Sequence, residues 1–131
     1  MGNLDAKRDW GHAKDFVNGI WKILQYHKPD DFVLATGRTY SVRDFVEQAF
    51  LCVDIQIKWV GKGLKEIGVN KENGNTLVKV DKRYYRPLEV NYLRGDSKKA
   101  ERLLNWKCKI SFRELVKEMV FSDLKRNKIV L

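Results

Sequence analysis

Two arginines, Arg8 in AKRDWG and Arg86 in RYYRPLEV, lie in apolar and aromatic sequence and are suited to binding an anion. A planar guanidinium offers paired N–H donors that match two phosphate oxygens, and bulky neighbours partly fix its orientation. Two such residues would suit a diphosphate. Glu89, three residues after Arg86, can lie on the same side, where its carboxylate would accept both hydroxyls of a ribose.

The alternative for these residues is a set of structural ion pairs. Arg8 would then pair with Asp9 or Asp15, and Arg86 would pair with Glu89. Composition alone favours this alternative, because charge pairs in proteins are often merely structural. The residues by themselves therefore leave both interpretations open.

Dinucleotide binding finds little support in the sequence. GKGLKEIG, residues 61–68, begins Gly-x-Gly after a predicted strand, but its next glycine is Gly68, where the dinucleotide fingerprint requires position 66. No helix is predicted to start there, and no acidic residue closes a second strand at the expected distance. The sequence therefore predicts no cofactor-binding loop.

Metal binding and hydrolytic chemistry are also disfavoured. His12 and His27 lack an accompanying cysteine or acidic cluster, so they are expected to cap or to pack. The two cysteines, Cys52 and Cys108, show neither metal-ligand spacing nor a disulfide framework. No nucleophile motif is present. We predict no catalytic residue and no metal ligand.

Helices and short strands must position the two arginines. Apolar periodicity and capping pairs predict helices over about residues 13–26, 41–53, 97–104 and 111–124. The first is expected to be buried through one face, consisting of Ala13, Phe16, Val17, Ile20, Trp21 and Leu24. Strands are predicted at 31–36, 55–60 and 77–81, with 61–76 as a long exposed loop or loose hairpin. The fold class is α/β, or α+β within this piece.

Length and charge limit the possible partners. The 131 residues suffice for one domain with its own core. A net charge of +9 favours an anionic partner, which would be nucleic acid, an acidic membrane or a phosphorylated ligand. No apolar run approaches the roughly 18 residues of a membrane span, and no secretory signal opens the chain. We expect a cytoplasmic protein without a membrane partner.

Six segments carry a resemblance to a known family. They resemble the C-terminal part of the GDP-mannose 4,6-dehydratases, which belong to the extended short-chain dehydrogenase/reductase family. The resemblance covers essentially the whole chain, in order, and DAKRDWGHAKD is its most specific part. The segments are GNLDAKRDWGHAKDFV (2–17), ATG (35–37), SVRDFVE (41–47), YYRPLEV (84–90), GDSKKAERLLNWK (95–107) and ELVKEMV (114–120).

The resemblance implies an architecture and a reaction. Family members combine an N-terminal Rossmann domain that holds NADP with a smaller C-terminal region that binds the sugar nucleotide, and they form homo-oligomers. Residues 1–131 would be that GDP-sugar-binding region of an extended Rossmann-type dehydratase. The enzyme is a lyase that converts GDP-mannose to GDP-4-keto-6-deoxymannose, on the route to GDP-fucose and related deoxyhexoses.

The resemblance also assigns binding roles to residues of this chain. Arg8 and Arg86 would contact the GDP phosphates, and Glu89 would hold the guanosine ribose. Asn3 and Leu4, just before the KRDWG motif, would lie near the guanine base.

The resemblance assigns packing roles to three aromatic residues. Trp10, Tyr84 and Tyr85 would pack around the two arginines and have no part in catalysis.

The catalytic parts of the family lie upstream of this chain. The glycine-rich phosphate loop, the Tyr-x-x-x-Lys pair and the accompanying Thr and Glu are missing, and no tyrosine here is followed by lysine four residues later. The NADP-binding domain is therefore expected to be absent, and this piece alone should neither bind NADP nor turn over. The missing half would be supplied in cis or in trans.

Two other hypotheses remain beside the dehydratase reading. One is a non-catalytic basic module that binds nucleotides or nucleic acid, although nucleic acid is not the partner we expect. The other is a structural remnant without any ligand.

Overall fold

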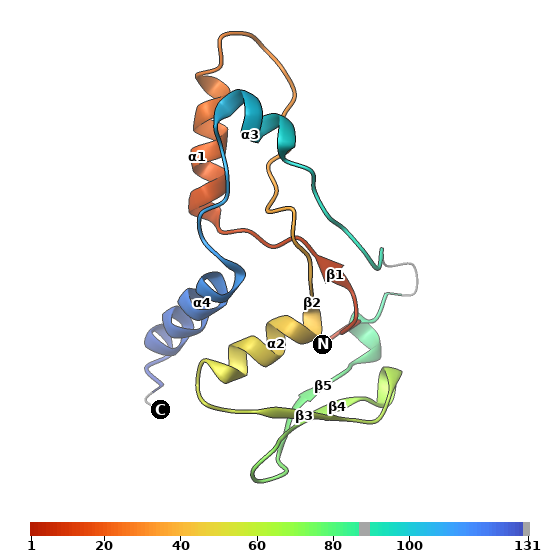
Figure 1. The fold of residues 1–131 in the computed structure, drawn as a ribbon. Coiled ribbons are helices and arrows are strands. Elements are labelled where there is room, and N and C mark those ends of the chain that lie inside the picture. The colour runs from red at the N-terminus through yellow and green to blue at the C-terminus, as the bar shows by residue number, and fades with distance from the viewer. Residues whose placement is uncertain (87–89, 130–131) are drawn as a thin grey trace.

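The computed structural model describes residues 1–86 and 90–129, and it confirms a mixed arrangement of helices and small sheets. Figure 1 shows α1 beside α3 at one end of the molecule, α2 and α4 in the middle, and the β3–β5 sheet at the other end. The helices are α1 (Ala13–Leu24), α2 (Val42–Leu51), α3 (Lys98–Leu104) and α4 (Phe112–Arg126), with 3-10 turns η1 (Gly63–Lys65) and η2 (Lys82–Tyr84). The strands are β1 (Lys7–Arg8), β2 (Tyr40–Ser41), β3 (Ile57–Val60), β4 (Ile67–Asn70) and β5 (Thr76–Lys79).

Local capping explains where the longer helices begin. The Ser41 hydroxyl accepts from the Asp44 amide at the start of α2, and the Asp44 carboxylate accepts from the Ser41 amide. Ser111 and Glu114 form the same reciprocal pair at the start of α4. Each capping box satisfies two N–H groups that a helix end leaves unpaired, which confirms both predicted starts.

The apolar face of α1 is exposed, so the prediction of a buried helix is wrong. The exposed fractions are 65 % for Val17, 53 % for Ile20, 58 % for Trp21 and 75 % for Leu24. The periodicity identified the apolar face correctly, but it carries no information about what covers that face.

The opposite side of α1 is the packed one. Asp15 and Gly19 are its buried residues. A β-carbon on Gly19 would lie 2.7 Å from a Leu34 methyl carbon and 2.9 Å from the Trp106 ring nitrogen, so only glycine fits. Trp106 itself is fully buried and donates its Nε1–H to the Asp15 carbonyl oxygen over 2.8 Å. This contact fixes α1 against the chain that follows α3.

The three-stranded sheet corrects the prediction for residues 61–76. Strands β3, β4 and β5 are antiparallel in that order, with Ile57 opposite Asn70 and Val60 opposite Ile67. The central strand β4 therefore lies inside the segment expected to be a loop or loose hairpin, and β5 begins at Thr76, one residue before the predicted strand. Strand β4 was missed because IGVN is short, contains glycine and is flanked by charged residues.

Residues 31–36 belong to no helix or strand of the described chain, which corrects a second prediction. An extended segment becomes a strand only when a neighbour pairs with it. Here contacts with the Asp9 side chain and with Gly95 hold the segment instead of strand pairing. The Asp9 carboxylate accepts from the Thr36 amide, and Gly95 packs so closely on Ala35 that a β-carbon would overlap the Ala35 side chain.

We predict that the exposed face of α1 drives self-association, because a contiguous apolar surface in water is a contact site. Replacing Ile20 and Leu24 together by Asp should shift sedimentation velocity profiles of the chain toward the monomer. Leu64→Asp, at a similarly exposed apolar residue in η1, is the matched control and should leave the distribution unchanged. A chain that is monomeric with its natural face intact would contradict the prediction.

Candidate functional site

Strand β1 carries Arg8 and lies beside the segment that leads to α3. The Lys7 amide donates to the Asn91 carbonyl oxygen over 2.7 Å, and the Leu93 amide donates to the Lys7 carbonyl oxygen over 3.1 Å. Lys7 and Tyr92 thereby form a parallel bridge. In Figure 1 the chain running up to α3 passes next to β1. Residues far apart in sequence thus meet at one edge of the molecule.

The Arg8 side chain is anchored by the main chain on both sides of this edge. Its Nη1 donates to the Lys7 carbonyl oxygen over 2.9 Å and to the Val90 carbonyl oxygen over 2.7 Å. Arg86 is exposed and lies four residues before Val90, so its Cα is within about 14 Å of the Val90 Cα even at full extension. The two arginines predicted to bind phosphate are therefore connected to the same segment.

The other predicted binding residues have different surroundings. Asn3 donates its side-chain N–H to the Asn91 side-chain oxygen over 3.3 Å. Leu4 is 3 % exposed, so a contact to a ligand would have to come from its main chain, and its carbonyl oxygen already accepts from the Arg43 amide over 2.9 Å. Glu89 lies outside the described residues.

The Asp9 carboxylate organises the backbone around Arg8. One oxygen accepts from the Thr36 amide over 2.9 Å and from the Thr36 hydroxyl over 2.5 Å. The other accepts from the amides of Gly37 and Gly95 over 2.9 and 3.2 Å. A carboxylate offers about four acceptor positions, so these four bonds use its capacity. Asp9 therefore serves the backbone and not the predicted ion pair with Arg8.

Asp15 is likewise committed to the main chain. Its carboxylate accepts from the amides of Lys109 and Ile110 over 3.0 and 2.9 Å. This side chain joins α1 to the turn before α4, which is a structural task. The predicted alternative partner for Arg8 is thus occupied elsewhere.

The aromatic residues near the arginines divide into two groups. Trp10 packs on Phe45 and Phe112, with ring centroids 5.1 and 5.9 Å apart. Tyr84 and Tyr85 are instead exposed. Trp10 is therefore a packing residue that holds the chain after β1 against α2 and α4. That these three aromatic residues pack around the arginines stays a prediction.

Arg43 connects the N-terminal segment to the sheet, a role that the sequence did not reveal. Its guanidinium binds both Glu66 oxygens, over 2.7 and 3.1 Å, and an Asp5 oxygen over 2.9 Å, and it lies 4.7 Å from the Trp59 ring centroid. The hydrogen bond to Glu66 is the main cause that raises the pKa of Arg43, followed by that to Asp5. These partners are scattered along the sequence, so no local pattern marks the network.

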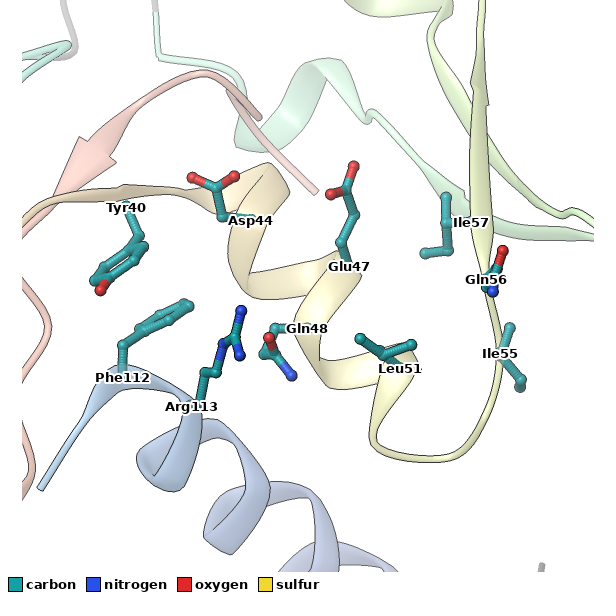
Figure 2. A pocket seen from close by; sticks show the side chains of 10 residues that line it. All are labelled: Tyr40, Asp44, Glu47, Gln48, Leu51, Ile55, Gln56, Ile57, Phe112 and Arg113. Atoms are coloured by element: carbon teal, nitrogen blue, oxygen red, sulfur yellow. The ribbon is translucent and has the colours of Figure 1, made fainter.

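A hollow of about 520 Å³ lies between α2, the chain entering β3 and the start of α4. Figure 2 shows Asp44 and Glu47 on α2 and Arg113 on α4 around it. Both carboxylates are already hydrogen-bonded, Asp44 to the Ser41 amide and Glu47 to the Trp59 ring N–H. No buried side-chain N or O atom of the described residues lacks a partner. This hollow therefore offers no unpaired buried group for chemistry.

The described residues give little support to acid–base or metal chemistry. His12 caps α1: its Nδ1 accepts from the Lys14 amide, so the neutral ring donates Nε2–H to Glu118 over 3.2 Å. This confirms the expected capping role. Residues 1–86 and 90–129 contain no group of three or more His, Cys, Asp or Glu side chains arranged to hold a metal ion. Within the same ranges, no helix has the length and apolar character needed to cross a bilayer.

Comparison with known sequences finds one family across most of the chain. The family model described as GDP-mannose 4,6 dehydratase matches residues 1–119. GDP-mannose 4,6 dehydratases from Dictyostelium discoideum and Homo sapiens are each 55 % identical over 124 residues, which are 95 % of this chain and 35 % and 33 % of the relatives. The Vibrio cholerae enzyme is 45 % identical over 136 residues, covering 96 % of this chain and 36 % of its own. The chain thus spans about a third of the length of these curated relatives.

Solved structures show the same fold at low sequence identity. RMD from Pseudomonas aeruginosa, complexed with NADPH, superimposes with a TM-score of 0.72 at 13 % identity, over 96 % of this chain and 35 % of that one. The dTDP-glucose 4,6-dehydratase from Bacillus anthracis, in complex with NAD, gives a TM-score of 0.65 at 16 % identity, over 98 % of this chain and 34 % of that one. These extended Rossmann-type neighbours confirm the predicted fold class.

We predict that Asp9→Asn lowers the free energy of unfolding by about 2 to 4 kcal/mol. The NH2 group of the asparagine side chain would face backbone N–H groups, which would then lack an acceptor. Urea denaturation followed by circular dichroism measures this loss. Asp123→Asn, at an exposed residue of α4, is the matched control and should stay within about 0.5 kcal/mol of the natural chain. Equal stabilities of the two variants would show that Asp9 does not have this central role.

We predict that the Cys108 thiol reacts slowly with alkylating agents. Burial is the main cause that raises its pKa from 9.0 to about 11, with Asp15 and Asp9 adding to the shift. The higher pKa lowers the thiolate population at pH 8 about 100-fold, and only the thiolate attacks. Iodoacetamide labelling with mass spectrometry should show much faster modification of Cys108 after unfolding in urea. Equal rates in the folded and unfolded chain would contradict this.

Proposed function

Because the chain belongs to the GDP-mannose 4,6-dehydratase family, we propose that residues 1–131 are its GDP-sugar-binding C-terminal region. In this proposal Arg8 and Arg86 contact the two phosphates of GDP. The observation that carries it is the bond from Arg8 to the Val90 carbonyl oxygen, which ties β1 to the segment carrying Arg86. This tie supports the proposal that two cations 78 residues apart in sequence contact one diphosphate.

The remaining contacts follow from the position of this edge. Glu89, between Arg86 and Val90 in sequence, would hold the ribose, and Asn3 and Leu4 would lie near the base. A charge-assisted hydrogen bond contributes about 1.5 to 3 kcal/mol net, so two arginines supply about 3 to 6 kcal/mol before ordering costs. This corresponds to a GDP affinity near millimolar for the chain alone.

The glycine-rich segment at residues 61–68 lacks the backbone turn typical of a dinucleotide-binding loop. Residues 61–66 form the connection between antiparallel β3 and β4, with η1 in the middle, and residues 67–68 begin β4, whereas a dinucleotide phosphate needs a strand-to-helix glycine turn. In our proposal NADP is held by the Rossmann half of the family polypeptide, present in cis or in trans. The exposed face of α1 is a suitable surface for that half to cover.

In the complete protein we propose conversion of GDP-mannose to GDP-4-keto-6-deoxymannose, in a cytoplasmic homo-oligomer. The part of this chain is to bind and orient the GDP end of the substrate. The chemistry at the sugar belongs to residues that this chain does not contain, so we assign it no catalytic residue.

We predict that the chain binds GDP and GDP-mannose selectively and weakly, and that Arg86→Ala removes this binding because one of two phosphate contacts is lost. Chemical-shift titration by NMR measures affinities in this range. Arg102→Ala, at an exposed arginine of α3, is the matched control and should bind GDP like the natural chain.

The same titration with RNA tests the non-catalytic alternative. Tight RNA binding that falls steeply with salt, together with no response to GDP-mannose, would overturn the proposed function. Failure of every ligand would leave only a structural role for the chain.

A further inference from the structure

The backbone on both sides of Arg94 is clamped to the residues on both sides of Arg8. The Leu93 amide donates to the Lys7 carbonyl oxygen over 3.1 Å, and the Gly95 amide donates to the Asp9 carboxylate over 3.2 Å. The backbone of Arg94 is therefore held at the edge that carries Arg8, although 86 residues separate the two in sequence. Fixed attachment lowers the entropy that a side chain loses on binding.

Arg8 and Arg94 line the same hollow, which has a volume of about 420 Å³. Asp9, Trp10, Leu93 and Gly95 complete its lining. The hollow is large enough for a phosphate group. It is also separate from the larger hollow beside α2, which neither arginine lines.

The Arg94 guanidinium has no hydrogen bond or ion pair with any residue in the ranges 1–86 and 90–129. Its acidic neighbours are engaged elsewhere. The four acceptor positions of Asp9 are filled by Thr36, Gly37 and Gly95, and Asp96 accepts from the Lys98 amide and pairs with the Lys98 ammonium over 3.8 Å. Within the described chain, this cation at the hollow is left without an acidic partner.

Arg8 and Arg94 both line this hollow, in a chain that carries a net charge of +9. A bound anion would be attracted by both guanidinium groups. A planar guanidinium offers paired N–H donors that match two oxygens of a phosphate. The hollow is therefore suited to a bound phosphate.

We propose that Arg94 is a third arginine of the diphosphate site, which binds a phosphate oxygen of the nucleoside diphosphate together with Arg8. This inference rests on the proposed function, since it places Arg94 at the same ligand. It adds a specificity residue that the sequence motifs did not indicate, because Arg94 lies outside both RYYRPLEV and the KRDWG motif.

The test compares Arg94→Gln with the natural chain in NMR titrations with GDP, inorganic pyrophosphate and guanosine. Gln keeps most of the side-chain length but removes the charge, so the variant should fold, and circular dichroism checks this. We expect the dissociation constants for GDP and pyrophosphate to rise about three- to tenfold. The response to guanosine should not change, since it has no phosphate. Arg102→Gln is the matched control and should change none of the three.

The outcomes separate this inference from the proposed function. If Arg86→Ala weakens GDP binding and Arg94→Gln does not, the inference about Arg94 is wrong and the proposed function stands. If Arg94→Gln weakens pyrophosphate binding and the chain never binds GDP, the anion site stands without the nucleotide. If neither anion responds to Arg94→Gln, the proposal is overturned.

Discussion

The Asp9 carboxylate joins three segments that are distant in sequence: the end of β1, the bend at residues 36–37 and the chain at Gly95 before α3. Backbone amides away from water need acceptors, and residues 36, 37 and 95 belong to no strand whose ladder would supply them. One side chain with four acceptor positions replaces that ladder. It also sets the distance between Arg8 and the segment returning toward α3, on which the proposed binding edge depends.

Two further contacts keep this frame in place. Asp15 and the fully buried Trp106 hold α1 against the turn before α4, while Trp10 packs β1 onto α2 and α4. Arg43 joins the N-terminal residues to the sheet through Asp5 and Glu66. The N-terminal segment is thus fixed at several points, which is what a binding residue such as Arg8 requires, because a loosely held arginine loses entropy on binding.

The exposed face of α1 is consistent with a chain that spans about a third of its curated relatives. A helix with this apolar periodicity is normally buried on that face in a folded protein. Here the packed side is defined by Gly19 and Asp15, which are small or polar residues that a hydrophobicity pattern assigns to solvent. The helix therefore packs one face against this chain and leaves its apolar face exposed.

The sequence by itself determined the helix starts, the apolar face of α1, strand β3 and the resemblance to the family. The helices and the strand depend on residues within a few positions of one another, such as Ser41 with Asp44 and Ser111 with Glu114, and the resemblance depends on residue order alone. Only the tertiary structure decided which face of α1 is buried, that residues 31–36 pair with no strand, and that Asp9 and Arg43 have these partners. It also placed Arg94 beside Arg8. Each of these depends on partners distant in sequence, from 23 residues for Arg43 with Glu66 to 95 residues for Asp15 with Ile110, and no local pattern encodes the position of such a partner.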